Sequence, residues 1–175
     1  AYGSHAELRA VAARTAWVVP PGMDVRLAAA IPVPFGTAHD CLFEFGRMRK
    51  GDIVLVQAGA SGVGVAAIQL AARAGAAMVL ATASSDERLE RLKPLGLTHG
   101  INYQRDDVVQ EVGRLTDKHM ADVIVDSVGG PTLQASILSL AYRGRVSMVG
   151  QAGREPMTVD VGSMMGANRS LSGVF

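Results

Sequence analysis

A glycine-rich turn between an apolar strand and an alanine-rich helix constrains this chain more than any other feature. Residues 53–58 begin Ile-Val-Leu-Val, a composition typical of a strand buried on both faces of a parallel sheet. Gly59, Gly62 and Gly64 follow at once and lead into a helical pattern over 62–74. Glycine permits a tight turn, and free N–H groups at a helix start can hold a phosphate. The segment predicts a dinucleotide-binding turn.

The turn departs at one place from the G-x-G-x-x-G fingerprint, because Ser61 stands between Gly59 and Gly64 where the middle glycine is expected. Serine adds little bulk and brings a hydroxyl. Such turns also occur as plain tight packing, so the match depends on its context. That context is the strand–helix alternation of the remaining chain, which a doubly wound sheet requires. We expect Ser61, Gly62, Val63 and Gly64 to contact a cofactor.

The pattern of apolar runs and turns predicts an α/β fold with a doubly wound, parallel, six-stranded sheet. Right-handed crossovers would give the strand order 3-2-1-4-5-6 and place a ligand crevice at the carboxyl ends of the strands. The expected strands cover 53–58, 77–82, 99–102, 121–126, 144–149 and 170–175, and the expected connecting helices cover 62–74, 85–94, 106–116 and 130–141.

The region before the first sheet strand reads differently. Residues 1–9 alternate like a strand, Asp24 can cap a short helix through about Ile31, and a proline pair then ends it before a second helix begins at Phe35. Both chain ends look cut, because the sequence opens and closes in strand-like runs. We expect residues 35–175 to be a dinucleotide-binding domain and residues 1–34 to belong outside it.

Composition excludes several function classes. The 175 residues carry a formal net charge of +1 with scattered Lys and Arg, which offers no electrostatic footprint for nucleic acid or an anionic membrane. The one cysteine, Cys41, rules out a disulfide framework. The sequence shows no signal peptide and no apolar run of membrane-spanning length. We expect a soluble, cytoplasmic protein.

The end of the second strand indicates which cofactor would bind. A carboxylate there would hydrogen-bond the ribose hydroxyls of NAD, but the strand ends at Ala83. Ser84, Ser85 and Arg88 follow, and hydroxyl donors with a guanidinium suit a phosphate monoester. These residues favour NADPH. The alternative is that Ser-Ser-Asp-Glu only caps the next helix and that Arg88 is solvated.

Over most of its length the chain resembles the middle of a medium-chain dehydrogenase/reductase of the zinc-independent NADPH:quinone oxidoreductase branch. The matching segments are Gly-Ser-His-Ala-Glu at 3–7, the helix containing Thr37, the turn at 60–64, Gly-Ile-Asn-Tyr at 100–103, and the fourth and fifth strands with their loops at 122–130 and 144–151. Members of that family are about twice as long as this chain, which agrees with the cut ends. The resemblance therefore implies that residues 1–34 are a remnant of a GroES-like, β-rich catalytic domain with a connecting segment, and that residues 35–175 are the Rossmann dinucleotide-binding domain.

The resemblance implies roles for individual residues. It places Tyr103 and Arg88 beside the adenosine 2′-phosphate and Thr37 beside the nicotinamide ring. It also implies that two strand-end loops border the ribose and nicotinamide, through Ser127 and Val128 in one and Val149, Gly150 and Gln151 in the other. Without the resemblance, Tyr103 would be interpreted as a residue that packs at the sheet edge with its hydroxyl in water. Thr37 would be interpreted as a residue whose hydroxyl is hydrogen-bonded within its own helix.

Zinc-dependent relatives carry a ligand cysteine where this chain has Val33, and valine cannot bind a metal. His5 and His39 lack a second ligand at a suitable spacing, and Cys41 is more plausibly a small buried residue. The resemblance therefore implies hydride transfer without zinc, from NADPH to a quinone or an α,β-unsaturated carbonyl, in a separate enzyme or in the enoyl reductase domain of a larger synthase. No residue of this segment qualifies as catalytic.

Two other functions stay open from the sequence. One is an NAD(H)-dependent, zinc-type alcohol dehydrogenase of the same fold, and the other is a nucleotide-binding regulatory protein without turnover. The Met-rich stretch 157–165 could line a substrate pocket or a subunit contact, although core packing is the better explanation. The last strand, at 170–175, is a sheet edge that needs covering, and the resemblance implies a homodimer formed through it.

Overall fold

The computed structural model describes residues 6–175, which form two compact units that meet between Pro32 and Val33. In the first unit, residues 13–15 form a short 3₁₀ turn, η1 (Ala13–Thr15), and residues 25–29 form helix α1 (Val25–Ala29). The Asp24 side chain accepts a hydrogen bond from the Arg26 N–H at 2.7 Å, which confirms the expected cap. Residues 6–9 do not form a strand, contrary to expectation, and residues 1–5, with His5, lie outside the described residues.

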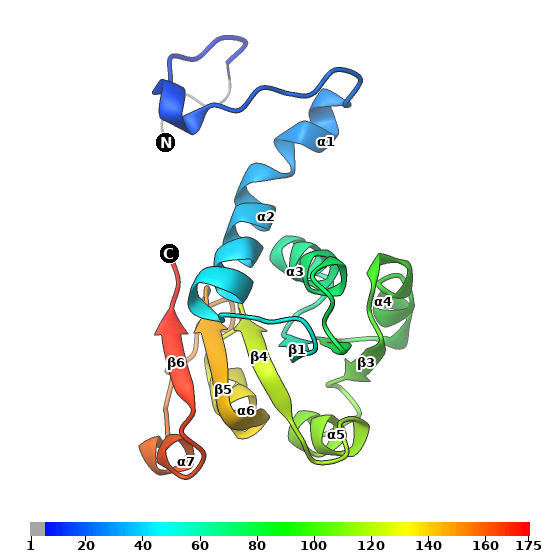
Figure 1. Ribbon diagram of the computed structural model, residues 1–175, viewed down its shortest axis with the longest axis vertical. Helices are drawn as coiled ribbons and strands as arrows, with labels where there is room; N and C mark the ends of the chain where they lie inside the picture. Colours follow the sequence, from blue (N-terminus) through cyan, green and yellow to red (C-terminus); the bar gives the residue numbers. More distant parts are fainter. Residues whose placement is uncertain (1–5) are drawn as a thin grey trace. The chain divides into compact units, whose positions relative to one another are not determined.

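The second unit is a parallel sheet of six strands in the order β3-β2-β1-β4-β5-β6 (Figure 1), which confirms the predicted topology. The strands are β1 (Ile53–Val56), β2 (Met78–Ala83), β3 (His99–Asn102), β4 (Ala121–Asp126), β5 (Leu140–Met148) and β6 (Ser170–Gly173). Every neighbouring pair is parallel. Beyond β6, the Val174 N–H still donates to the Met148 carbonyl at 2.8 Å, so the pairing extends past the strand.

Helices cover both faces of the sheet. One layer holds α2 (Pro32–His39), the π-helical segment η2 (Asp40–Phe45), α3 (Gly62–Arg73), α4 (Asp86–Glu90) and the 3₁₀ turn η3 (Lys93–Leu95), and the other holds α5 (Val108–Leu115), α6 (Pro131–Leu138) and α7 (Val161–Met165). Side chains alternate between the two layers along each strand. Val54 and Val56 face the α3 layer, whereas Leu55 faces the α5–α6 layer.

Three helix predictions need correction, and one helix was missed. The helix expected over 85–94 is instead α4 at 86–90, followed by the separate turn η3. The helix expected from Phe35 begins at Pro32, because proline is tolerated in a first helical turn where N–H groups have no intrahelical partner. The helix expected over 130–141 ends at Leu138, and β5 starts two residues later. Helix α7, in the Met-rich stretch, was not predicted; the Asp160 side chain caps it by accepting from the Gly162 N–H at 2.9 Å.

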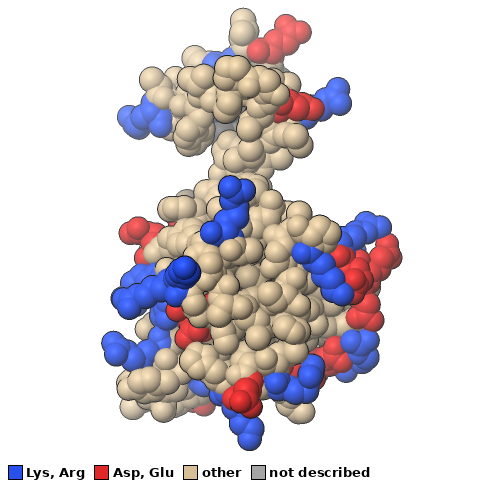
Figure 2. Space-filling view, turned by 45° about the vertical axis from the view of Figure 1, so that its right-hand side comes forward, with Lys and Arg blue, Asp and Glu red and all other residues tan. Residues whose placement is uncertain are grey.

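Charged side chains are spread over the surface. Figure 2 shows basic and acidic groups interspersed on the face it displays, in keeping with a formal net charge of +1. Among the described residues, no helix has both the length and the hydropathy needed to cross a membrane.

Candidate functional site

The glycine turn joins β1 to α3 with little free space. A Cβ atom on Gly59 would lie 2.7 Å from the Ala81 Cβ, and one on Gly64 would lie 2.5 Å from the Ala58 carbonyl oxygen. The Ser61 hydroxyl oxygen accepts a hydrogen bond from the Gly64 N–H at 3.1 Å and so caps α3. Two of the fingerprint glycines are therefore required by close backbone packing, and Ser61 replaces the third with a helix cap.

A pocket of about 200 Å³ lies beside this turn at the carboxyl ends of β1 and β2. It brings together four residues that the sequence predicted for cofactor binding: Ser61, Ser84, Arg88 and Tyr103. Within residues 6–175 the Arg88 guanidinium has no hydrogen-bond or ion-pair partner, and no carboxylate lines the pocket. The pocket presents an uncompensated cation and hydroxyl groups next to a helix start.

The two acidic residues after Ser85 are held by other partners. Asp86 accepts hydrogen bonds from the Asn102 amide at 3.1 Å and from Arg105 at 3.0 Å. Glu87 forms an ion pair with Arg91 at 2.7 Å. Neither Asp86 nor Glu87 lines the pocket of about 200 Å³. Ser85 itself caps α4, with its hydroxyl oxygen 3.4 Å from the Arg88 N–H, and it lies outside the pocket.

A second pocket, of about 270 Å³, adjoins the first, since Ala58 and Tyr103 line both. Its other walls are mainly apolar and include Val108, Val128 and Ala135. Tyr103 is 49% exposed and lines both pockets. Two adjoining pockets at the strand ends can hold a ligand that has two parts.

Two loops continue the site along the carboxyl edge of the sheet. The Gly153 N–H donates to the Val128 carbonyl at 2.9 Å, and a Cβ on Gly150 would lie 2.7 Å from the Ser127 carbonyl oxygen. The structure therefore brings together the two predicted loops that contain Ser127 and Val128 and Val149, Gly150 and Gln151. The half-buried Thr37 lies in α2 and lines neither pocket.

A buried polar network under the two pockets was missed by the sequence analysis. The Thr82 hydroxyl donates to the Gln57 side-chain oxygen at 2.7 Å, the Gln57 amide donates to Ser136 Oγ at 3.0 Å, and Ser136 donates to Asp126 Oδ2 at 2.9 Å. All four side chains are at most 2% exposed. The other oxygen of Asp126 accepts the N–H groups of residues 128 and 129, which begin the loop beside the apolar pocket.

This network joins β1, β2, β4 and α6 at the level where the strands end. Each member donates to the next, so the three hydrogen bonds run in one direction from Thr82 to Asp126 and pair polar groups that a low-dielectric interior would otherwise penalise. Its signal in the sequence was a polar residue at the end of an apolar strand: Gln57 after β1 and Asp126 closing β4. We assign these residues a positioning role, because they hold the loop that begins at residue 128 beside the apolar pocket.

The residues present do not form a zinc site. Val33 is 76% exposed and offers no donor atom, and no group of three or more His, Cys, Asp or Glu in the described part of the chain could hold a metal ion. Burial raises the pKa of the Cys41 thiol to about 12, so it stays protonated at neutral pH. The His39 ring packs against Phe43 and lies 3.2 Å from an Asp40 carboxylate oxygen.

Comparison with known proteins shows the family to which the chain belongs. The family model described as "Zinc-binding dehydrogenase" matches residues 62–175. Quinone oxidoreductase-like protein 2 of Bos taurus is 35% identical over 159 residues, which are 91% of this chain and 46% of that protein. The chain therefore spans about half the length of this curated relative.

Two solved structures have the same fold. Mycobacterial Rv1454c complexed with NADPH superimposes with a TM-score of 0.82 at 32% identity, over 90% of this chain and 48% of that one. CurK enoyl reductase superimposes with a TM-score of 0.79 at 29% identity, over 91% of this chain and 47% of that one.

Proposed function

Because the chain belongs to the zinc-binding dehydrogenase family, in the quinone oxidoreductase branch of the medium-chain dehydrogenase/reductase superfamily, we propose that it is the cofactor-binding core of an NADPH-dependent oxidoreductase. The observation that carries the proposal is the pocket where Ser84, Arg88 and Tyr103 meet without a carboxylate. A guanidinium and hydroxyl donors match a ribose 2′-phosphate, whereas NAD would call for an acid at the end of β2.

The remaining contacts follow from the order of the site along the sheet edge. The adenine ring fits the apolar pocket beside Val128, and the pyrophosphate fits the α3 start at 62–64, where N–H groups and the helix dipole favour an anion. The loop at 149–151 then lies toward the nicotinamide, and Thr37 is assigned beside that ring by family resemblance. Nicotinamide supplies the hydride, and the chain's residues hold and orient it.

We further propose that the acceptor is a quinone or an α,β-unsaturated carbonyl and that zinc takes no part. Such acceptors are already electron-poor, so they need orientation and hydrogen bonds to the developing oxyanion rather than a Lewis acid. The exposed Val33 and the protonated Cys41 thiol fit this reading. An NAD(H)-dependent, zinc-type alcohol dehydrogenase and a nucleotide-binding regulator without turnover are the competing functions.

Replacing Arg88 by alanine tests the cofactor assignment. NADPH is expected to bind the unchanged chain about tenfold or more tightly than NADH, and Arg88→Ala should remove most of that preference, because a charge-assisted hydrogen bond to phosphate is lost. Cofactor fluorescence titrations at low salt measure both affinities. Arg91→Ala is the matched control: Arg91 is exposed near the same helix but paired with Glu87 and outside the pocket. Equal affinities for NADPH and NADH in the unchanged chain would refute the assignment.

We also propose a homodimer through β6. This strand is the outer edge of the sheet, with Leu171 36% exposed, and unpaired backbone groups of an edge strand favour pairing with a second copy. Light scattering of the purified chain at micromolar concentration is expected to give twice the mass of one chain. A single-chain mass across that range would count against the edge as an interface.

A further inference from the structure

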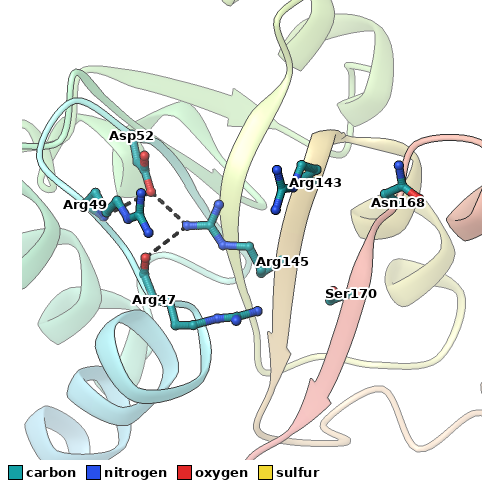
Figure 3. Close-up of a pocket in the computed structure, with 7 residues that line it drawn as sticks. All are labelled: Arg47, Arg49, Asp52, Arg143, Arg145, Asn168 and Ser170. Atoms are coloured by element: carbon teal, nitrogen blue, oxygen red, sulfur yellow. Dashed lines mark hydrogen bonds and ion pairs between the residues drawn. The ribbon is translucent and has the colours of Figure 1, made fainter.

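Another pocket lies where the strands begin, at the end of the sheet opposite to the candidate cofactor site. Its volume is about 450 Å³, and four arginines line it against a single carboxylate, Asp52. Arg47 and Arg49 come from the loop before β1, and Arg143 and Arg145 come from β5 (Figure 3). We call these residues the arginine pocket. None of them lines the two pockets of the cofactor site.

Arg145 has a structural role in this pocket. Its guanidinium donates to the Gly46 carbonyl at 2.8 Å, to the Arg47 carbonyl at 3.1 Å and to Asp52 Oδ2 at 2.9 Å. The side chains of Arg145 and Asp52 are each 18% exposed. In Figure 3, Arg145 lies between the loop residues and the β5–β6 residues. The only carboxylate of the lining is therefore already neutralised, and it holds the loop against the sheet.

The three other arginines keep their charge unpaired. Within residues 6–175 the guanidinium groups of Arg47, Arg49 and Arg143 have no hydrogen-bond or ion-pair partner. Arg47, Arg49 and Arg143 are exposed, and three cations that line one concave surface repel one another. Folding alone does not require this arrangement, because Arg145 and Asp52 already tie the loop to the strand.

Backbone conformation points the same way. Arg47 has φ +47° and Arg143 has φ +60°, in the left-handed region that non-glycine residues rarely adopt. The Arg143 N–H is anchored by a 2.8 Å hydrogen bond to the Ala167 carbonyl. Glycine would suit both positions better, so the arginine side chains are not explained by the turns in which they stand. Arg47 and Arg143 share one further property, which is that both line the arginine pocket.

We propose that the arginine pocket binds a small anion that carries two or more phosphate charges. Guanidinium groups present planar sets of donors that match phosphate oxygens in a bidentate manner. The volume of about 450 Å³ falls in the range of small-molecule sites. A concave site accommodates a compact ligand better than it accommodates the flat surface of another protein. The arginine pocket is distinct from the cofactor site, because the two lie at opposite ends of the strands.

A titration of the ¹⁵N-labelled 175-residue chain with pyrophosphate, followed by NMR at constant ionic strength, tests this site. Saturable shifts are expected for the amides of Arg47, Arg143 and Asn168. The double variant Arg47→Gln/Arg143→Gln should weaken this binding about tenfold or more, because two charge-assisted contacts are lost. Arg154→Gln is the matched control, since Arg154 is also exposed and left-handed, at φ +53°, but lies outside the pocket. It should change the affinity less than about twofold.

Three outcomes would overturn the proposal. Shifts confined to residues 61–64 would show that pyrophosphate uses only the dinucleotide turn, and equal weakening by the double variant and by Arg154→Gln would show a general charge effect. Binding of a hexaglutamate peptide at the pocket without binding of pyrophosphate would assign the surface to an acidic protein. If the double variant does not fold, Arg49→Gln takes its place, because its side chain makes no contact that the fold uses. The result does not depend on whether the cofactor is NADPH or NADH.

Discussion

Replacing Gly64 by alanine is expected to destabilise the chain by about 3 kcal/mol. The new Cβ would lie 2.5 Å from the Ala58 carbonyl oxygen and 2.6 Å from that of Gly59, and both are backbone atoms that cannot rotate away. The turn would have to open, which also moves the start of α3 away from the pocket that Ser61 and Arg88 line. Thermal unfolding followed by circular dichroism should show a melting temperature lower by about 6–12 °C.

Gly62→Ala is the control for this prediction. A Cβ at Gly62 meets only Pro34 side-chain atoms, at 3.7 Å and beyond, which is ordinary contact. Alanine is also favoured over glycine in a helix by up to about 1 kcal/mol. The control should therefore melt at or slightly above the temperature of the unchanged chain. Equal losses in the two variants would mean that helix 62–73 does not pack against the turn as described.

Replacing Asp126 by alanine is expected to cost about 4 kcal/mol. Its carboxyl group is fully buried and accepts the N–H groups of Val128 and Gly129 and the hydroxyl of Ser136. Each buried polar group left without a partner costs about 1–3 kcal/mol. Because the freed N–H groups begin the loop beside the apolar pocket, cofactor affinity should fall as well. Urea unfolding and cofactor fluorescence measure the two effects.

Asp126→Asn separates the hydrogen bonds from the charge. The amide keeps an oxygen that can accept from both loop N–H groups, and Ser136 can turn its hydroxyl to accept from the new amide. We expect a loss below about 2 kcal/mol, with cofactor affinity largely retained. If asparagine proved as damaging as alanine, the hydrogen-bonded loop would not be the reason that Asp126 matters.

The fold was largely predictable because its signals are local. The apolar run at 53–56 and the glycine turn at 59–64 specify a buried strand that runs into a helix, and the repeated alternation of strands and helices leaves few topologies for a parallel sheet. The misjudged boundaries have local causes too. Pro32 opens a helix where the prolines were read as an ending, and the helix at 161–165 is only five residues long.

The candidate site likewise contains residues that local signals predicted and residues that only contacts between distant segments reveal. Ser84, Arg88 and Tyr103 were predicted from strand ends and family resemblance, and they meet in one pocket. Gln57 and Ser136 were not predicted, because their hydrogen bond joins residues 79 positions apart. No local pattern shows which buried polar side chain will meet which.

By itself, the sequence determined the class of fold, the strand order and the place of the glycine-rich turn, because periodicity and glycine spacing act within a few residues. Only the tertiary structure decided which charges are compensated. Asp86 is turned to Asn102 and Arg105, and Asp52 is taken by Arg145, 93 positions away. Among residues 6–175, Arg88 is thereby left without a side-chain partner in one pocket, and Arg47, Arg49 and Arg143 are left without one in another. Pairing of charges depends on distances that exist only once distant segments are packed together, and those distances decide where this protein can hold an anion.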